Sequence, residues 1–319
     1  NRYPVLTIGA NERERNFTWY SKKGEESHAT IKVKDGEEIE LKANVLEDTN
    51  LQGFNSNQAN IKNLDPNNEY VISLYADNKL VKEIPFETKG NSDYSFFLAG
   101  DPQIGASGNG ENDSKTWNEM LGKLNDLDND ASFLLSAGDQ VNTATNEDQY
   151  SGYIEIPGME GLTIATIIGN HDSSSKAYQE HFALPNRTGL GKTEAGDNYY
   201  FTYNNTLFIM LNSNNRSQAE HRETIRKAIE DTKDMDIKWK VVSFHHATYS
   251  TASHAEDGDI IDRRNTLPPI FKEFGIDLVL MGHDHVYTRT HIMDGTKPLV
   301  EYDEEGNPPS RYINPKGQL

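Results

Sequence analysis

Short runs in which hydrophobic and polar residues alternate fill the first part of the chain. They lie at residues 17–20, 30–33, 39–45, 70–75 and 80–86, and polar or Gly-containing segments such as residues 34–36 separate them. Alternation with a period of two is typical of strands that bury one face and expose the other. Several such strands at this spacing predict an all-β sandwich over residues 1–90.

The pattern changes after a polar link at residues 88–93. Compact apolar runs predict buried strands at 94–100, 131–137, 162–168, 239–244 and 276–281, and helical spacing predicts helices at 114–127 and 217–231. We also expect a hairpin at 199–211 and a helix that begins at Pro268. Alternating strands and helices indicate a layered α/β domain over residues 94–319. The tail after Asp303 is rich in Gly and Pro and has no clear stop, so the alternative of a truncated fragment stays open.

Five of these predicted strands run directly into polar residues that metals can bind. These residues are Asp101, Gln103, Asp139, Gln140, Asn170, His171, Asp172, His245, His246, His283, Asp284 and His285. Glycine precedes the first polar residue in four of the five clusters, which permits a tight turn and close backbone approach. Parallel strands place their carboxyl ends at one edge of a sheet, where α/β proteins bind ligands. We therefore expect these distant segments to meet in one cleft.

The residue types in this cleft indicate metal chemistry. Carboxylates, imidazoles and an amide, without thiolates, form a mixed donor set that suits Mn, Fe or Zn. Six such groups can hold two cations when one carboxylate bridges them, and paired cations activate water and neutralise phosphoryl charge. Each motif alone is weak, because Gly-Asp turns are common and the pair His245-His246 could be a strand end with local hydrogen bonds. Five successive strand ends of this kind favour a metal site.

The order of these residues resembles the signature of the calcineurin-like metallophosphoesterases. The resemblance is carried by Asp101, Gly138-Asp139, the segment from Gly169 to Asp172, His245 and the segment from Gly282 to His285. Residues 64–70, which contain Pro66 and Tyr70, look like the tyrosine corner of a fibronectin type III sandwich, where the Tyr hydroxyl bonds back to the backbone. A sandwich in front of such a domain is similar to the purple acid phosphatases. The resemblance implies a four-layer domain of β-sheets flanked by helices.

Carried over by position, the resemblance implies a role for each site residue. Asp139 would bridge both metals, Asp101 and His285 would hold the first metal, and Asn170, His245 and His283 would hold the second. His171 would contact the phosphoryl group and help protonate the leaving oxygen, and Asp172 would orient the His171 ring. His254 falls where purple acid phosphatases have a second phosphate-facing histidine, and a solvated loop histidine is the alternative.

Two positions depart from the family pattern. Gln103 stands where the broad family has a histidine, and Asn142 stands where purple acid phosphatases have a tyrosine ligand. That phenolate gives those enzymes their colour and favours ferric iron. We therefore expect no purple colour and two divalent cations, Mn, Fe or Zn. Gln103 or Asn142 would either donate an amide oxygen to the first metal or lie outside the ligand set.

The charge of the chain limits the classes of partner that it can bind. Of 319 residues, 31 are basic and 50 are acidic, which gives a net charge of −19. This balance disfavours a nucleic-acid backbone and an anionic membrane as partners, and bound metals would offset it for a small phosphorylated substrate. No apolar run approaches the length of about 18 residues that a membrane span needs. The oligomeric state stays open.

The expected location comes mainly from the resemblance. Cysteine is absent, which excludes disulfides and thiolate metal sites. The sequence starts at Asn1 without an initiator Met, as a trimmed precursor would. Because phosphoesterases with a sandwich in front are typically exported, we expect a secreted or cell-surface protein of a bacterium.

These observations lead to one main hypothesis and two alternatives. The main hypothesis is hydrolysis of phosphate monoesters by attack of a hydroxide held by two metals, with His171 assisting the leaving group. The first alternative is a phosphodiesterase or nucleotide hydrolase that uses the same site. The second is a surface binding protein whose site has decayed, with Gln103 and Asn142 as marks of that decay.

Overall fold

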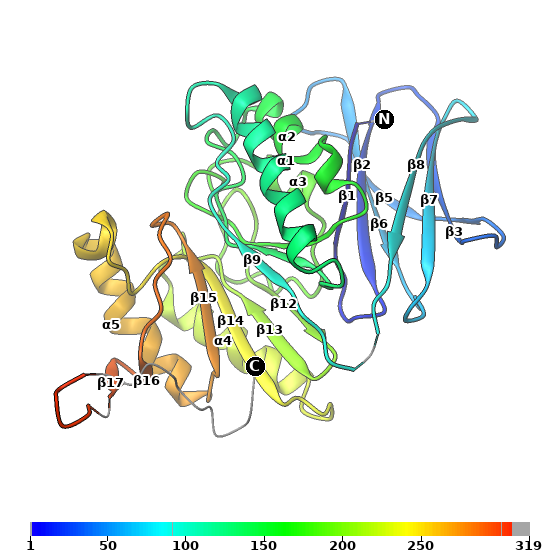
Figure 1. Cartoon of the computed structure of the whole chain (residues 1–319). Helices are drawn as coiled ribbons and strands as arrows, with labels where there is room; N and C mark the ends of the chain where they lie inside the picture. The colour runs from blue at the N-terminus through cyan, green and yellow to red at the C-terminus, as the bar shows by residue number, and fades with distance from the viewer. Residues whose placement is uncertain (1, 91, 301, 308–319) are drawn as a thin grey trace.

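The computed structural model describes residues 2–90, 92–300 and 302–307 of the chain (Figure 1). The N-terminal strands are β1 (Arg2–Ile8), β2 (Arg15–Lys22), β3 (Ser27–Val33), β4 (Ile39–Glu40), β5 (Ala43–Leu46), β6 (Phe54–Ile61), β7 (Glu69–Ala76) and β8 (Lys79–Glu87). The later strands are β9 (Phe97–Ala99), β10 (Leu134–Ser136), β11 (Thr163–Thr166), β12 (Tyr199–Tyr203), β13 (Thr206–Met210), β14 (Trp239–His246), β15 (Leu278–Gly282), β16 (Ile292–Asp294) and β17 (Lys297–Leu299). The helices are α1 (Gly110–Leu127), α2 (Glu147–Ile154), η1 (Pro157–Met159), α3 (Ala177–His181), α4 (Gln218–Asp231), η2 (Ser253–Glu256) and α5 (Gly258–Glu273).

Three sheets organise the described residues. The long sheet has seven strands there, in the order β5-β6-β2-β1-β11-β10-β9. The mixed sheet has the order β12-β13-β14-β15, and the N-terminal sheet has the order β4-β3-β7-β8. Strands β16 and β17 form a separate hairpin. The end of the expected α/β domain, residues 308–319, lies outside the described residues.

The α/β region has the four layers that the resemblance implies. Helices α1, α2 and α3 cover the outer face of the long sheet, where Trp117 of α1 is buried (Figure 1). The long and mixed sheets face each other across a core in which the Phe133 ring lies 5.8 Å from Phe201 and 5.6 Å from Phe208. Helices α4 and α5 cover the far face of the mixed sheet through residues such as Ile225.

The N-terminal region is all-β, as expected. The N-terminal sheet packs on strands β1, β2 and β6 of the long sheet through a core that includes Trp19 and Ile72. The Tyr70 hydroxyl accepts a hydrogen bond from the Asp65 backbone N–H at 2.8 Å, which confirms the expected corner. The prediction of a single strand at 39–45 is wrong. Strand β4 belongs to the N-terminal sheet and β5 to the long sheet, and the chain crosses between them at Leu41, which is buried in this core.

The two regions share one sheet. Strand β1 pairs in parallel with β11, with Leu6 opposite Thr163, and antiparallel with β2. The sheet of the α/β region therefore continues into the N-terminal β region. The division into residues 1–90 and 94–319 stays a prediction.

The last helix differs from the sequence prediction. Helix α5 begins at Gly258, and Pro268 lies inside it instead of starting it. Leu267, Ile270 and Phe271 form a buried apolar stripe against the mixed sheet. Burial of this stripe outweighs the cost of a proline within a helix.

Candidate metal centre

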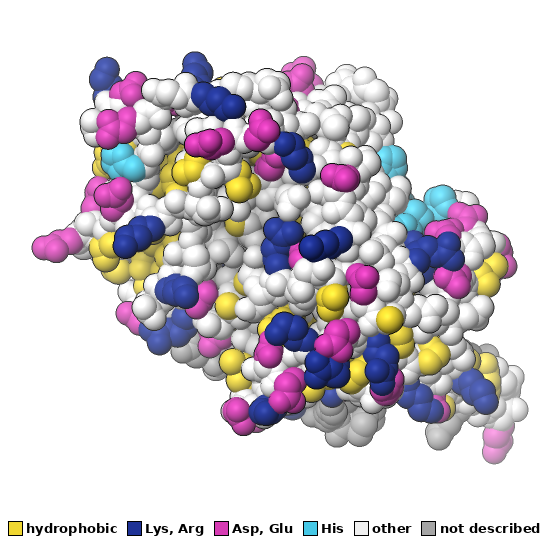
Figure 2. Space-filling view, turned by 180° about the vertical axis from the view of Figure 1, so that it is seen from behind, with side chains coloured by type: hydrophobic (Ala, Val, Ile, Leu, Met, Phe, Trp, Pro, Cys, Tyr) yellow, Lys and Arg dark blue, Asp and Glu magenta, His cyan; other side chains and the backbone are white. Residues whose placement is uncertain are grey.

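The five polar clusters come from both sheets of the α/β region. Strands β9, β10 and β11 run parallel in the long sheet, and β14 and β15 run parallel in the mixed sheet. The expectation of convergence is confirmed, although two sheets contribute instead of one. Figure 2 shows histidine side chains along the right edge of the molecular surface and another on the left side.

Glycines let the strand ends approach each other closely. A Cβ atom on Gly169 would lie 2.0 Å from Asp139 Oδ1 and 2.2 Å from the Asp139 backbone N. A Cβ atom on Gly282 would lie 2.7 Å from the Ala137 carbonyl oxygen and 2.8 Å from Asp101 Oδ2. The backbone at Gly138 has a φ of +98°, which only glycine adopts easily. The loops that carry Asp139, Asn170 and His283 therefore pack so closely that only glycine fits at positions 138, 169 and 282.

Three donor atoms converge on one point. Asn170 Oδ1 lies 3.0 Å from both His245 Nε2 and His283 Nδ1, and those two nitrogens are 3.3 Å apart. Donor atoms that sit about 2.1 Å from one cation are spaced about 3.0–3.4 Å apart, so the set fits a divalent metal. This is the ligand group expected for the second metal.

The two carboxylates border this group. Asp139 Oδ2 lies 3.3 Å from His245 Nε2, and Asp139, His245 and His283 form a cluster able to hold a metal ion. Asp101 Oδ1 lies 3.8 Å from His245 Nε2 and 3.5 Å from His285 Nε2. Asp139 is thus within reach of the second group, and Asp101 with His285 forms the start of a first group.

A hydrogen bond to the backbone fixes which nitrogen of the His245 ring faces the cluster. Its Nδ1 donates to the Ala137 carbonyl oxygen at 2.8 Å, so Nε2 is the atom left for the cluster. Burial opposes protonation, but the hydrogen bond and charge of Asp139 raise the pKa of His245 to about 9. A cation at this position would replace that proton. Burial and the nearby His245 charge lower the pKa of His283 to about 4.

His171 lies beside the cluster and is held by the two departures from the family pattern. Its Nδ1 donates to the Asn142 carbonyl oxygen at 2.8 Å, and its Nε2 accepts from Gln103 Nε2 at 3.0 Å. Gln103 Nε2 also donates to Asn142 Oδ1 at 3.0 Å. Both amides therefore contact the His171 network in this structure.

Asp172 occupies a different place from the expected one. It is fully buried, and its carboxylate accepts from the backbone N–H groups of Asp139, Gly169 and Gln140 at 2.8, 2.8 and 3.1 Å. Asn142, not Asp172, supplies the acceptor for His171 Nδ1, so the expected orienting role of Asp172 is wrong. Burial and the charge of Asp139 raise the pKa of Asp172, while backbone donors oppose that shift.

His254 lies at the rim of the centre. Its ring is 4.5 Å from the His283 ring, and its Nδ1 pairs with Asp257 at 2.7 Å. This hydrogen bond, opposed by slight burial, raises the pKa of His254. The side chain is 45% exposed, so a position facing the cleft is open to it. Its phosphate-facing role stays a prediction.

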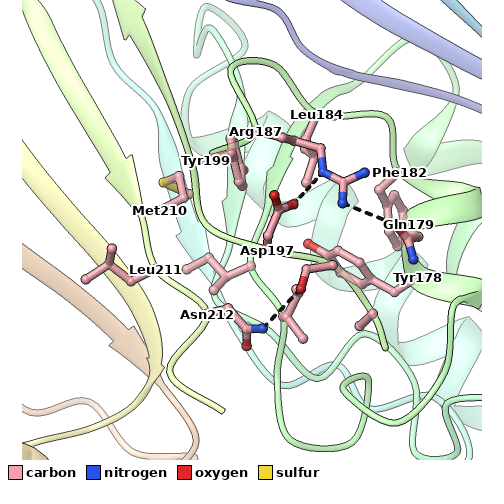
Figure 3. Close-up of a pocket in the computed structure, with 14 residues that line it drawn as sticks. Tyr178, Gln179, Phe182, Leu184, Arg187, Asp197, Tyr199, Met210, Leu211 and Asn212 are labelled. Carbon is pink, nitrogen blue, oxygen red and sulfur yellow. Dashed lines mark hydrogen bonds and ion pairs between the residues drawn. The ribbon is translucent and has the colours of Figure 1, made fainter. Parts of the chain in front are cut away.

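A small cavity lies behind the Gly169 loop, lined by Ile168, Tyr178, Asp197 and Asn212 among others (Figure 3). Figure 3 shows Arg187 paired with Asp197 at this cavity. Its volume of about 20 Å³ suffices for a water molecule and not for a phosphate ester. The metal cluster, and not this cavity, is therefore the candidate site for a phosphorylated substrate.

Known proteins show similarity over most of the chain. The calcineurin-like phosphoesterase family model matches residues 94–287. An uncharacterised protein of Mycobacterium tuberculosis is 30% identical over 142 residues, which cover 40% of this chain and 26% of that protein. Purple acid phosphatase 17 of Arabidopsis thaliana is 39% identical over 67 residues, which cover 21% of this chain and 18% of that protein. The matches thus span about a quarter or less of these relatives.

The fold comparison agrees. The purple acid phosphatase PPD1 of yellow lupin superposes with a TM-score of 0.70 at 19% identity, covering 88% of this chain and 58% of that one. PhoD superposes with a TM-score of 0.52 at 11% identity, covering 88% of this chain and 71% of that one. Among the helices of the described part of the chain, none has the length and apolar character that crossing a membrane requires. The family match over more than half of the chain shows that this protein belongs to the calcineurin-like phosphoesterases, with a fold of the purple acid phosphatase type.

Proposed function

We propose that this protein hydrolyses phosphate monoesters with two divalent cations. The observation that carries the proposal is the approach of Asn170 Oδ1, His245 Nε2 and His283 Nδ1 to within 3.0–3.3 Å of one another. Asp139 would hold both cations, and Asp101 with His285 would complete the first. Bound divalent cations supply an activated water and neutralise charge on the phosphoryl group.

The chain's own residues then act on the substrate. His171 holds a proton on Nδ1, and its Nε2 is the atom that can carry a second proton to the leaving oxygen. Because Gln103 now donates to that Nε2, substrate entry would have to displace the Gln103 amide or share its hydrogen bond. His254 at the rim would meet the outer phosphoryl oxygens.

We favour monoesters over diesters by analogy with the purple acid phosphatase that shares this fold. A phosphodiesterase on the same site is the alternative within this chemistry. A decayed binding protein would have no reason to keep six donor groups together at the strand ends.

The test compares aryl phosphate monoester and bis-aryl phosphodiester hydrolysis by the purified protein loaded with Mn²⁺. We expect faster monoester hydrolysis, loss of activity on chelation, and recovery when Mn²⁺ returns. Asp139→Asn should lose both metals, whereas His171→Ala should keep them and lose rate. His28→Ala, in the N-terminal sheet, is the matched histidine control. Full activity after exhaustive metal removal would overturn the proposal.

We also propose that the protein is secreted or displayed on a bacterial cell surface, and that its N-terminal region is a fibronectin-like module. The resemblance to exported phosphoesterases with a sandwich in front supports the location, and the tyrosine corner at Tyr70 supports the fibronectin-like module. Fractionation of the producing cells tests the location: recovery of the protein from the cytoplasm alone would contradict it.

A further inference from the structure

Two adjacent histidines on β14 are in opposite hydrogen-bonding states. His245 Nδ1 donates to the Ala137 carbonyl oxygen, so Nε2 is the ring nitrogen that faces the cluster. His246 Nδ1 lies 2.8 Å from the hydroxyl of Ser213. The direction of that second hydrogen bond decides what His246 can do.

The contacts of Ser213 give the direction. Its hydroxyl oxygen already accepts from the His246 backbone N–H at 3.2 Å, and its carbonyl accepts from Arg263. Among the described residues the Ser213 hydroxyl proton has no acceptor other than His246 Nδ1, and we take Ser213 as the donor of this hydrogen bond. The neutral His246 ring then carries its own proton on Nε2. His246 Nε2 is therefore a hydrogen-bond donor and has no lone pair for a metal.

This donor sits against the metal cluster without a protein partner. The His246 side chain is 5% exposed, and its ring lies 4.8 Å from the His283 ring and 5.3 Å from the His245 ring. Among the described residues, none accepts a hydrogen bond from its Nε2. Because Nε2 is not among the fully enclosed polar atoms of the described residues, a ligand or a water can reach it and supply the acceptor.

We propose that His246 Nε2–H donates to an oxygen of the phosphoryl group, as a substrate-binding residue separate from the metal ligands. The inference rests on the proposed function, because it names a further contact at the same site. A tetrahedral phosphate offers several acceptor oxygens, and those that the cations leave free need donors. Ser213 is then a positioning residue that fixes which His246 nitrogen carries the proton.

The test measures inorganic phosphate binding by calorimetry on Mn²⁺-loaded protein, together with metal content by elemental analysis. We expect His246→Leu to keep two Mn²⁺ per chain and to weaken phosphate binding by about 10-fold to 100-fold, as for loss of one hydrogen bond to a charged group. His246→Gln, which retains an N–H donor, should recover most of the affinity. Ser213→Ala should give an intermediate loss, because the ring proton is then no longer fixed on Nε2. In steady-state assays KM should rise more than kcat falls.

Each result decides the inference. Unchanged phosphate affinity in His246→Leu with both metals present would overturn it, and so would loss of metal, which would make His246 part of the metal shell. If His246→Leu does not fold, the contrast between His246→Gln and Ser213→Ala carries the test, and equal affinities would overturn the inference. His28→Leu is the control. Phosphate binding that depends on His246 in a protein that hydrolyses no ester would uphold the inference and reject the proposed function. A wild-type protein that binds no phosphate would reject the inference.

Discussion

The Asp172 carboxylate accepts a hydrogen bond from the backbone N–H of Asp139 at 2.8 Å. The same oxygen accepts from Gly169 N–H, and the other oxygen accepts from Gln140 N–H. One buried carboxylate thus joins the loop after β10 to the loop after β11. Because Asp139 and Asn170 lie on these two loops, Asp172 fixes the distance between two expected metal ligands.

Replacing this acceptor should loosen the centre. In Asp172→Asn an amide NH₂ replaces one oxygen and must face a backbone N–H. We expect Mn²⁺ affinity to fall at least about 10-fold and the free energy of unfolding to fall by about 2 kcal/mol. Equilibrium dialysis and urea denaturation measure the two effects. The exposed Asp126→Asn on α1 is the control, and an unchanged Mn²⁺ affinity in Asp172→Asn would contradict this reading.

Glycine substitutions should separate close packing from helix propensity. Gly169→Ala would place a methyl group within 2.2 Å of the Asp139 backbone N, so the loops must move apart. We expect it to lower the free energy of unfolding by about 2–3 kcal/mol and to weaken metal binding. Gly122→Ala, on an open part of α1, should raise the free energy of unfolding by about 1 kcal/mol. Equal effects of the two substitutions in urea denaturation would show that the Gly169 contact is not constraining.

A buried cluster between the two regions should make stability depend on pH. Glu147 on α2 accepts from His181 Nε2 at 2.9 Å and from Asn50 Nδ2 at 2.6 Å. Burial opposes its ionisation, but the His181 and Asn50 contacts hold the pKa of Glu147 below its usual value of 4.5. A lowered pKa in the folded state stabilises the protein above pH 4.5, and this contribution is lost as the pH falls further.

Glu147→Gln should therefore lower the free energy of unfolding by about 1–2 kcal/mol at pH 7. The difference from the wild type should shrink as the pH is lowered below 4.5. Urea denaturation over a pH series measures it, with the exposed Glu111→Gln as the control. A difference that stays constant with pH would show that the Glu147 charge makes no contribution.

The residue at position 142 should decide the colour of an iron-loaded protein. Asn142 contacts His171 through its carbonyl and Gln103 through its side chain, and it has no phenolate to offer. We expect the iron-loaded wild type to lack a visible charge-transfer band and Asn142→Tyr to gain one. Absorption spectra of both proteins after ferric loading test this. Asn44→Tyr, on the exposed part of β5, controls for an added tyrosine, and a coloured wild type would contradict the expectation.

Much of the fold was predictable because burial leaves a periodic mark. The hairpin of β12 and β13, the helices α1 and α4, and the five strands that lead to the cleft all follow from local patterns. Strand β1 carries no such mark, and its pairing with β11 depends on contacts more than 150 residues apart. The start of helix α5 was placed at Pro268 instead of Gly258 because a proline normally starts a helix, and tertiary burial overrode that rule.

The sequence was enough to predict which residues meet at the site. It was not enough to predict the hydrogen bonds that those residues make. Glycine followed by Asp, Asn or His at successive strand ends marked the cluster. The role of Asp172 was misassigned because sequence shows a neighbouring His and Asp but not where each side chain points. The donor state of His246 depends on Ser213, which lies 33 residues away, and no local pattern announces such a partner.

The continuity of the long sheet through β1 limits where this chain can be divided. A fragment that begins at residue 94 would lack β1, so the backbone groups of β11 that pair with β1 would be exposed at the edge of the sheet. Such an exposed strand edge promotes self-association. The N-terminal region therefore cannot be removed as an independent unit. A fusion protein that carries the phosphoesterase region must also contain Arg2–Ile8 or another strand that pairs with β11.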